Sequence, residues 1–391
     1  MTTLAVAQLG APTAVLNSTL QGFLEGAGPC RVLGCHGGPL GLLRGDLRPL
    51  RLSTEGGPLT EHSDAVVLSP GTAAAPGAFL GAGRHRFAEF EIGAAVEGLL
   101  SAGVDGLALI GGNGTMYLAD QLHRTAARRR GQRLSVVAVP KTVDNDVAGT
   151  DHCPGFPSAA RFLVQAVCAL ALDQQAMVSI EQVRLVETLG RSSGWLALST
   201  LSARAVTGGA PHLVYLPERP FDEASFLDDV SSNVARHGSV LVVVAEGTST
   251  GTGPTQFDHP VFDRPLSGGV APGLAKLVEE RLGLGCRAEV LGLLQRCATW
   301  AVSAVDRQEA YTLGAEAARR LLGGDSGVMV GLPERGGGPP AATAPTVVPL
   351  GDVAGRTKRV PSKWVPAPEG ESEEFLQWLT PLVADGEADD G

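Results

Sequence analysis

The sequence has few cysteines and no long hydrophobic run. Its six cysteines are scattered without any C-x-x-C spacing, which argues against a disulfide framework and predicts reduced, structural thiols. Apolar stretches such as 107–110 and 240–245 fall far short of the roughly 18 residues that a membrane-spanning helix needs, so none is predicted. The N-terminus lacks both a basic leader and a small-residue cleavage site. We therefore expect a cytoplasmic protein with no membrane association.

Positive charge is also in short supply. The 391 residues include 31 basic and 41 acidic side chains, and the formal charge of −10 argues against nucleic-acid binding. Only four of the basic residues are lysines, so Lys141, which stands between a proline and a threonine, draws attention. An anionic ligand must therefore be attracted by a local cluster of charge. The 44% hydrophobic content is enough for cores in two or three domains of about 150 residues each.

Strand-like and helix-like patterns alternate along the chain. In chain order the first of these segments are 4–9, 14–26, 106–110, 116–130 and 134–139, and the alternation continues to residue 245. This order predicts an α/β fold with mainly parallel sheets, in which ligands lie beyond the carboxyl ends of the strands. We expect no function from the Pro/Gly-rich segment 334–345 or from the acidic tail 384–391.

Two turns that follow strands combine residue types suited to phosphate chemistry. The turn 111–115 (Gly-Gly-Asn-Gly-Thr) gives backbone room for a phosphate beside a helix start, although a tight βα turn has the same pattern. The turn 140–146 (Pro-Lys-Thr-Val-Asp-Asn-Asp) holds two carboxylates two residues apart. One can accept a hydroxyl proton and the other can support Mg²⁺, as phosphoryl transfer requires, whereas the alternative is a solvated turn. The candidate cations for the moving phosphoryl group are Arg84, Arg191 and Arg296.

These motifs resemble the 6-phosphofructokinase family, and most closely its pyrophosphate-dependent branch. The resemblance runs from Leu4 to about Val383. It is carried by motifs in a fixed order, namely 10–17 (Gly-Ala-Pro-Thr-Ala-Val-Leu-Asn), 111–115, 140–146, 187–197 (Glu-Thr-Leu-Gly-Arg-Ser-Ser-Gly-Trp-Leu-Ala), 292–296 (Gly-Leu-Leu-Gln-Arg) and 360–364 (Val-Pro-Ser-Lys-Trp).

The resemblance implies a phosphofructokinase fold of two Rossmann-like lobes with the active site between them. Residues 1–155 plus about 295–345 would form the donor-binding lobe, and about 156–294 plus 346–391 the sugar-phosphate-binding lobe. The implied reaction is Mg²⁺-dependent phosphoryl transfer from pyrophosphate or ATP to the C1 hydroxyl of fructose 6-phosphate, which gives fructose 1,6-bisphosphate in glycolysis. A homodimer or homotetramer is implied, because Arg287 comes from the adjacent subunit in such enzymes.

The family's site residues carry over to matching positions of this sequence. Asp144 would be the base that takes the C1 hydroxyl proton, and Asp146 and Asn113 would support the metal. Lys141 would bind the leaving phosphate, and Arg191 would stabilise charge during transfer. Residues implied to line the donor are Gly10, Arg84, Gly112, Asn113, Gly114 and Thr115. Residues implied to hold fructose 6-phosphate are Thr142, Leu189, Gly190, Glu246, Arg287, Leu293 and Arg296.

Two positions indicate different donors. In this family, a glycine at the position of Gly114 leaves room for the α-phosphate of ATP, whereas an aspartate there goes with pyrophosphate. Lys141 is typical of pyrophosphate users, whose leaving phosphate a compact ammonium can bind. The segments 10–13 and 360–364 also match the pyrophosphate branch. The sequence therefore slightly favours pyrophosphate, with ATP as the alternative.

Three departures from the family pattern bear on function. Asn113 replaces a metal-associated aspartate, Leu293 replaces a histidine or tyrosine that would bind the sugar phosphate, and Gln182 replaces an arginine of bacterial ATP-dependent enzymes. These changes predict weaker binding of the 6-phosphate or a preference for a related sugar phosphate. A second hypothesis is a non-catalytic phosphate- or nucleotide-binding regulatory homologue, against which the presence of Asp144 and Asp146 argues. A third hypothesis, a nicotinamide-dependent oxidoreductase, fails because the sequence lacks the glycine spacing that such an enzyme requires.

Overall fold

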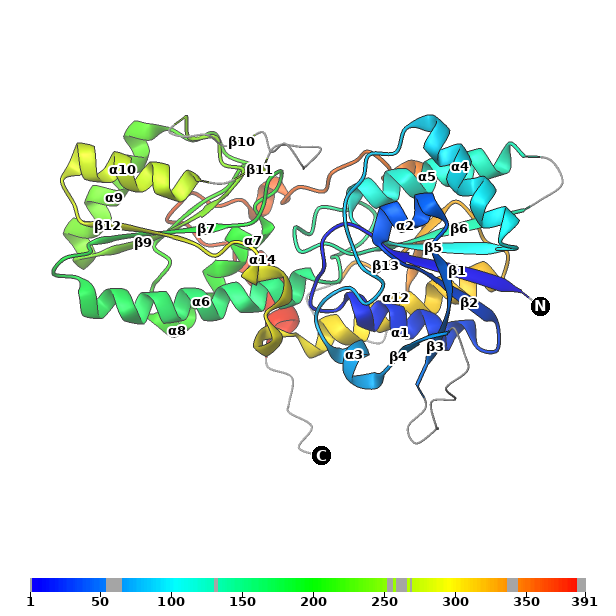
Figure 1. The fold of residues 1–391 in the computed structure, drawn as a ribbon. Helices are drawn as coiled ribbons and strands as arrows, with labels where there is room; N and C mark the ends of the chain where they lie inside the picture. The colour runs from blue at the N-terminus through cyan, green and yellow to red at the C-terminus, as the bar shows by residue number, and fades with distance from the viewer. Residues whose placement is uncertain are drawn as a thin grey trace.

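The computed structural model describes residues 2–53, 65–129, 133–251, 256–257, 266–267, 269–335 and 344–384. Two sheets, each covered by helices on both faces, form two lobes that lie side by side (Figure 1). The predicted α/β fold with two Rossmann-like lobes is confirmed. Most of the Pro/Gly-rich segment 334–345 and of the acidic tail 384–391 lies outside the described residues.

The first lobe contains an eight-stranded sheet. Its order is β14 (Thr346–Pro349), β13 (Val328–Gly331), β6 (Ser135–Pro140), β5 (Gly106–Gly111), β1 (Thr3–Gln8), β2 (Arg31–Cys35), β3 (Leu47–Leu52) and β4 (Val66–Leu68). The strands from β13 to β2 are parallel, β14 runs antiparallel to β13, and β3 runs antiparallel to β2 but parallel to β4. Strands β1 and β5 are buried along their whole length, as continuous apolar strands covered on both faces must be.

Helices cover both faces of this sheet. One face carries α1 (Leu16–Ala27), α3 (Pro70–Ala74) and α12 (Ala304–Leu322), and the other carries α2 (Gly38–Arg44), α4 (Glu89–Ser101), α5 (Asn113–Ala127) and α13 (Leu350–Val353). The strand order reverses direction between β1 and β5. The turns that follow these two strands therefore flank the switch point where open α/β sheets bind ligands.

The second lobe is built on a parallel sheet of four strands. Its order is β12 (Cys286–Val290), β7 (Val183–Thr188), β9 (Val240–Ala245) and β8 (Leu213–Tyr215). One face packs against α6 (Phe156–Met177), α7 (Trp195–Ser199), α8 (Arg204–Thr207), α11 (Leu294–Cys297) and α14 (Glu373–Val383), with the 3₁₀ turns η1 (Thr200–Ala203), η2 (Thr299–Ala301) and η3 (Ser362–Trp364). The other face packs against α9 (Glu223–His237) and α10 (Val270–Leu282). A short ribbon pairs β10 (Gln256–Phe257) with β11 (Leu266–Ser267).

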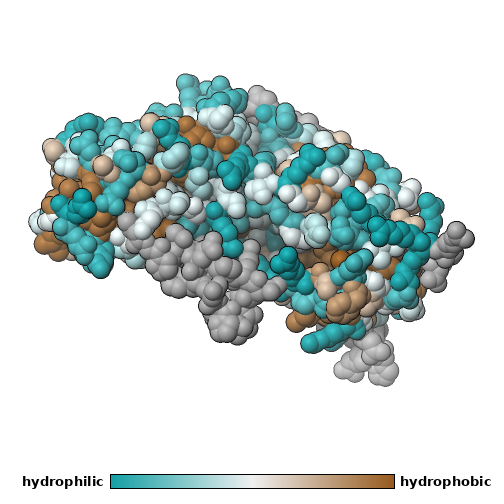
Figure 2. All heavy atoms as spheres, turned by 90° about the horizontal axis from the view of Figure 1, so that it is seen from above, coloured by the Kyte–Doolittle hydropathy of each residue, from teal (hydrophilic) through white to brown (hydrophobic). Residues whose placement is uncertain are grey.

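The helix α6 has the length and apolar composition that a membrane span requires, although polar residues interrupt its apolar sequence. Half of its most apolar 18-residue stretch is buried inside the protein, where Phe156, Leu163 and Val167 belong to the core of the second lobe. A core helix meets the same test of length and composition. Seen from above, both lobes show hydrophilic residues interspersed with hydrophobic ones (Figure 2).

The division between the lobes differs in detail from the sequence prediction. Strand β14 pairs with β13 and helix α13 packs in the first-lobe core, so this lobe extends to about residue 353 instead of ending at 345. In the other direction, Ala298 and Ala301 pack in the core of the second lobe. The C-terminal helix α14 lies in the second lobe as predicted, with Trp378 stacked on Phe156. The sequence of an edge strand such as β14 does not indicate which strand it pairs with.

The helices α1 and α12 approach closely through glycine. A Cβ atom added at Gly22 would lie 1.9 Å from the carbonyl oxygen of Tyr311, and one added at Gly314 would lie 2.0 Å from that of Thr19. Backbone atoms cannot move aside as a flexible side chain can. The contact therefore requires glycine on both helices.

We predict that Gly22→Ala lowers the free energy of unfolding by at least about 1–3 kcal/mol through overpacking. The matched control is Gly93→Ala in α4, where an added Cβ meets nothing within 4 Å. This control should be neutral or stabilising by about 0.5–1 kcal/mol, because alanine favours the helix. Urea denaturation followed by circular dichroism measures both, and equal stabilities of the two variants would contradict the close contact.

Candidate active site

The carboxyl ends of strands from both sheets meet where the two lobes join. The first lobe contributes the turns after β1, β5 and β6, and the second contributes those after β7 and β9 together with segment 292–297. We call this group of segments the inter-lobe site. Parallel sheets place their ligand-binding loops at this end, so one location collects most of the predicted residues.

The turn after β1 is tied to the loop that carries Arg84. The backbones of Gly10 and Gly83 form two hydrogen bonds, with N–O distances of 2.7 and 2.9 Å. Gly10 has φ +80°, and an added Cβ there would lie 3.3 Å from Nζ of Lys141. Glycine is therefore required for the backbone to pass over the lysine. This pairing brings Arg84, which is exposed, into the electrostatic neighbourhood of Lys141.

Lys141 is 2% exposed and lies beneath this turn. Its ammonium donates to the carbonyl oxygens of Leu9 and Ala11. Burial, followed by repulsion from Arg296 and Arg84, lowers the pKa of Lys141 to about 7, while Asp144 acts in the opposite direction. The predicted cations and the predicted base therefore influence one another directly. An arriving phosphate would stabilise the charged form of this lysine.

The turn after β6 alternates buried and half-buried side chains. Asp144 and Asp146 are half-buried, whereas Val143 and Asn145 between and before them point into the protein. The backbone N–H of Asp144 donates to the hydroxyl of Thr142 at 3.1 Å. This local hydrogen bond shapes the turn so that both carboxylates lie on one side of it.

The first turn of α5 contacts this carboxylate pair. The side-chain amide of Asn113 donates to Oδ2 of Asp146 at 2.8 Å and to its carbonyl oxygen at 2.9 Å. Thr115 is buried, and its N–H bonds the carbonyl of Gly112, which leaves the earlier N–H groups of the helix start for a ligand. An added Cβ at Gly114 meets nothing within 4 Å. The space beside the helix start is therefore open.

Two groups here have the chemistry of a magnesium site. Oδ1 of Asn113 is buried and has no hydrogen-bond partner, and it lies beside the Asp146 carboxylate. Burial and the charge of Asp144 raise the pKa of Asp146 to about 6, and a cation bound beside it would favour its ionised form. Within the described residues, no three His, Cys, Asp or Glu side chains gather as a metal cluster. Donor phosphates and water would therefore have to complete the coordination of Mg²⁺.

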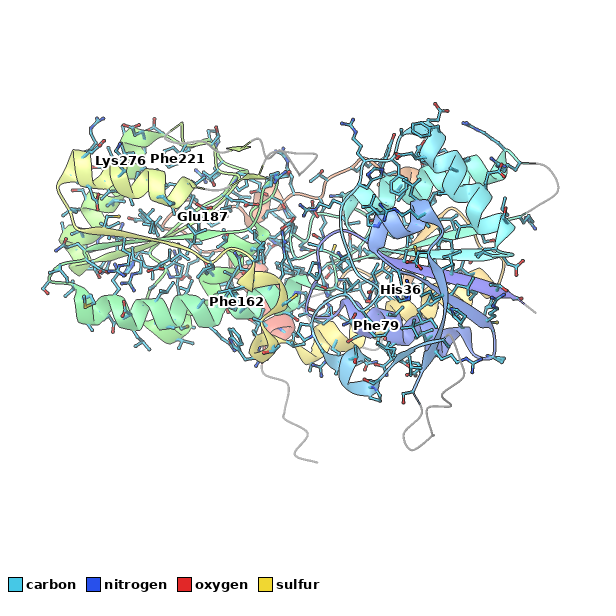
Figure 3. All side chains as sticks on the ribbon, in the orientation of Figure 1. His36, Phe79, Phe162, Glu187, Phe221 and Lys276 are labelled. Atoms are coloured by element: carbon cyan, nitrogen blue, oxygen red, sulfur yellow. The ribbon has the colours of Figure 1, made fainter. Side chains whose placement is uncertain are left out.

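The second lobe places Glu246 and Arg191 opposite Asp144. Glu187, which Figure 3 labels, is buried at the end of β7. It accepts hydrogen bonds from the N–H groups of Gly269 and Ala271 at the start of α10. This contact anchors the strand that leads to Arg191. Glu246 follows β9, and burial together with the charge of Asp144 raises its pKa to about 7, while Arg191 opposes the shift.

The segment 292–297 reaches the site through an amide side chain that sequence reasoning passed over. Gln295 is buried, accepts from the N–H of Leu189 at 3.1 Å and donates to the carbonyl of Gly292 at 3.0 Å. The next residue, Arg296, lies close enough to Lys141 for its charge to lower the pKa of that lysine. Leu293 is an apolar side chain that is 66% exposed, and it therefore offers no polar group at this predicted sugar-phosphate position.

Arg287 is the one predicted residue that lies apart from the others. It is exposed on the edge strand β12, where it pairs with Arg184 in register, and it forms an ion pair of 2.7 Å with Glu181. Its place is toward the opposite end of the strand from the inter-lobe site. The remaining predicted residues, namely Gly190, Thr142 and the glycines of the two turns, belong to the site's own segments.

Ser193 is another contact that the sequence pattern did not single out. Its hydroxyl, from the loop after β7, donates to the carbonyl oxygen of Asp144 at 3.3 Å and so links the two lobes at the base. A serine beside an arginine has no distinguishing signal in a single sequence. Only the approach of the lobes gives it this role.

Comparison with known proteins agrees with this geometry. The family model described as phosphofructokinase matches residues 3–321. A sulfofructose kinase from Alkalicoccus urumqiensis is 36% identical over 328 residues, covering 84% of this chain and 82% of that protein. A pyrophosphate–fructose 6-phosphate 1-phosphotransferase from Xanthomonas campestris pv. campestris is 32% identical over 398 residues, covering 98% and 92%. An ATP-dependent 6-phosphofructokinase 2 from Streptomyces coelicolor is 32% identical over 352 residues, covering 89% and 92%.

A solved structure shares the whole architecture. The pyrophosphate-dependent phosphofructokinase from Marinobacter aquaeolei superposes with a TM-score of 0.82 at 26% identity, covering 98% of this chain and 92% of that one. Fold, carboxylate turn and surrounding cations define a phosphotransferase. The chain belongs to the phosphofructokinase family.

The raised pKa values of Asp146 and Glu246 predict an acid limb in the pH–rate profile. As the pH falls, Glu246 loses its negative charge near pH 7 and Asp146 loses its charge near pH 6. The value of kcat/KM for phosphoryl transfer should therefore fall from pH 7.5 to 5.5. Glu246→Gln removes the higher ionisation and should move the midpoint of the limb toward 6. A midpoint unchanged in this variant would show that Glu246 does not titrate in the free enzyme.

Proposed function

We propose that this protein transfers a phosphoryl group from pyrophosphate to the C1 hydroxyl of fructose 6-phosphate and forms fructose 1,6-bisphosphate in glycolysis. The observation that supports the proposal is the closeness of Asp144, Arg84 and Arg296 to the buried Lys141, whose pKa the charge of each of them shifts. A base and at least one cation on the moving group are the minimum that phosphoryl transfer needs.

Asp144 would accept the C1 hydroxyl proton as the hydroxyl oxygen attacks the terminal phosphorus. The new oxygen–phosphorus bond forms while the bridging oxygen–phosphorus bond breaks, and inorganic phosphate leaves. Lys141 and Arg84 on the donor side, with Arg191 on the acceptor side, would stabilise the charge that moves between these oxygens. Mg²⁺ bound at Asp146 and Asn113 would neutralise donor charge.

The donor side contains features that suit each of two phosphate sources. The buried Lys141 under Gly10 supports pyrophosphate, because a compact ammonium matches a small leaving phosphate. The open space beside Gly114 supports ATP as the alternative, since nothing there excludes a longer polyphosphate. We favour pyrophosphate, since the lysine supplies a charge whereas the glycine supplies only room.

Two substitutions should separate the donors. Lys141→Gly should lower kcat/KM for pyrophosphate by about 100-fold or more and affect ATP less, because it removes a donor to the leaving group. Gly114→Asp places a carboxylate in the open space and should lower kcat/KM for ATP by about 100-fold through like-charge repulsion, with a smaller effect on pyrophosphate. Equal losses with both donors in both variants would contradict the assignment.

A second acceptor is favoured by a specific observation. Leu293 exposes an apolar side chain where the sugar-phosphate grip was predicted, and a sulfofructose kinase shows 36% identity over 84% of the chain. A sulfo group carries one negative charge and has no proton to donate, so it needs fewer polar partners than a phosphate. The alternative acceptor is therefore a fructose that carries a sulfo group in place of the 6-phosphate.

The decisive assay pairs each donor with each acceptor. Purified protein with Mg²⁺ is incubated with pyrophosphate or ATP, and with fructose 6-phosphate or sulfofructose, and C1-phosphorylated product is measured. We expect the highest kcat/KM for pyrophosphate with fructose 6-phosphate. Asp144→Ser should reduce kcat by about 10²–10⁴-fold with little change in substrate affinity. Ligand binding without product in every combination would indicate the non-catalytic homologue instead.

A further inference from the structure

Asn145, between the two carboxylates of the turn, has an unusual backbone conformation. Its φ is +52°, and within the part of the chain that the structure describes it is the one non-glycine residue with positive φ. Asparagine adopts this left-handed conformation more readily than most residues, but it still needs support. The side chain is fully buried. The conformation of Asn145 decides where Asp144 and Asp146 point, since each is its direct neighbour.

Lys358 supplies that support from more than 200 residues along the chain. Its ammonium donates to Oδ1 of Asn145 at 3.1 Å, to the carbonyl of Thr150 at 3.1 Å and to that of Asp151 at 2.7 Å. An ammonium has three donors, so all three protons are used. Oδ1 of Asn145 also accepts from the N–H of Cys153 at 3.0 Å, which fills both of its lone pairs.

The backbone around Lys358 is joined to the same turn. The N–H of Lys358 donates to the carbonyl of Asp146 at 2.8 Å, and Thr357 forms an antiparallel bridge with Val147. The carbonyl of Lys358 accepts from the indole of Trp195, and its ammonium lies 5.2 Å from the centre of that ring. Both the main chain and the side chain of Lys358 are therefore held in place beside the turn.

We propose that Lys358 is a positioning residue for phosphoryl transfer, which holds Asn145 in its left-handed conformation and thereby aims the flanking carboxylates. It does not touch the reacting atoms. Its effect passes through the Oδ1 atom of Asn145. The inference deepens the proposed function and rests on it, because the atoms that Lys358 aims are the proposed base and metal ligand.

Removing the ammonium leaves three oxygen acceptors short of a donor. Two of them are backbone carbonyls of the loop that continues the turn, and the third is Oδ1 of Asn145, whose other donor is the N–H of Cys153. A carboxylate displaced by about 1 Å costs on the order of 100-fold in rate, because general base catalysis depends on the approach geometry. Substrate affinity depends on other residues of the site.

The test compares Lys358→Met with Asn145→Gly and with the double variant. Lys358→Met should lower kcat by about 10- to 100-fold, with KM values within about twofold of the wild type. Asn145→Gly keeps the left-handed backbone but removes the acceptor, so it should also lower kcat. The double variant should be no slower than the slower single variant. If the loss of kcat in the double variant equals the product of the two single losses, Lys358 does not act through Asn145 and the inference is overturned.

The matched control is Lys363→Met in the same segment. Lys363 is exposed, pairs with Glu374 and lies over the ring of Trp364. It resembles Lys358 in type and aromatic contact but does not contact the turn, and its kcat should stay within about twofold of the wild type. If Lys358→Met does not fold, Asn145→Gly carries the test, and an unchanged kcat in that variant overturns the inference.

Hydrogen exchange separates this inference from the proposed function. In Lys358→Met, amides of 142–150 should exchange faster by about tenfold, while those of β1 and β5 should not change. This readout needs no turnover. A wild type without activity on any substrate pair would overturn the proposed function. Faster amide exchange in Lys358→Met would still show that Lys358 stabilises the turn. An active wild type, with kcat and exchange unchanged in the variant, would overturn the inference alone.

Discussion

The structure depends on the placement of opposite charges in a partly buried site between two sheets. Asp144 stands at the end of a first-lobe strand, and its charge raises the pKa values of Asp146 and Glu246 while it favours the charged form of Lys141. Groups from two sequence regions, the turn 140–146 and the end of β9, therefore share one electrostatic environment. Without ligand, burial and like charges oppose their ionisation. A polyphosphate with Mg²⁺ would supply the missing charges, so binding and activation of the site are the same event.

Much of the site could be predicted from the sequence because its chemistry is local. Lys141, Asp144 and Asp146 belong to a single turn, and a turn after a parallel strand must face the carboxyl edge of the sheet. Glycine turns mark close backbone approaches, as Gly10 over Lys141 confirms. The fold class followed from the alternating strand and helix patterns for the same reason: each pattern lies within a few residues.

Contacts between distant segments could not be predicted. Gln295 and Ser193 act through backbone groups that only the finished fold brings near, and any serine or glutamine has the same local signal. The lobe boundary was misplaced because β14 is an edge strand whose partner is not encoded nearby. Arg287, taken from the family resemblance, lies away from the inter-lobe site within this chain. Its predicted role concerns a neighbouring subunit and stays a prediction.

The late position of Lys358 has a consequence for biosynthesis. The turn that carries Asp144 and Asp146 is made early, but Lys358, which contacts Asn145 in it, comes more than 200 residues later, and Trp378 adds a hydrogen bond to Asp151 from the C-terminal helix. A nascent chain that emerges N-terminus first thus exposes the carboxylates long before Lys358 and Trp378 are made. If Lys358 has its proposed role, a chain that ends before residue 357 would contain Asp144 and Asp146 without the contacts that hold Asn145 between them. The C-terminal segment would then serve the site through its contacts with this turn, without contacting a substrate.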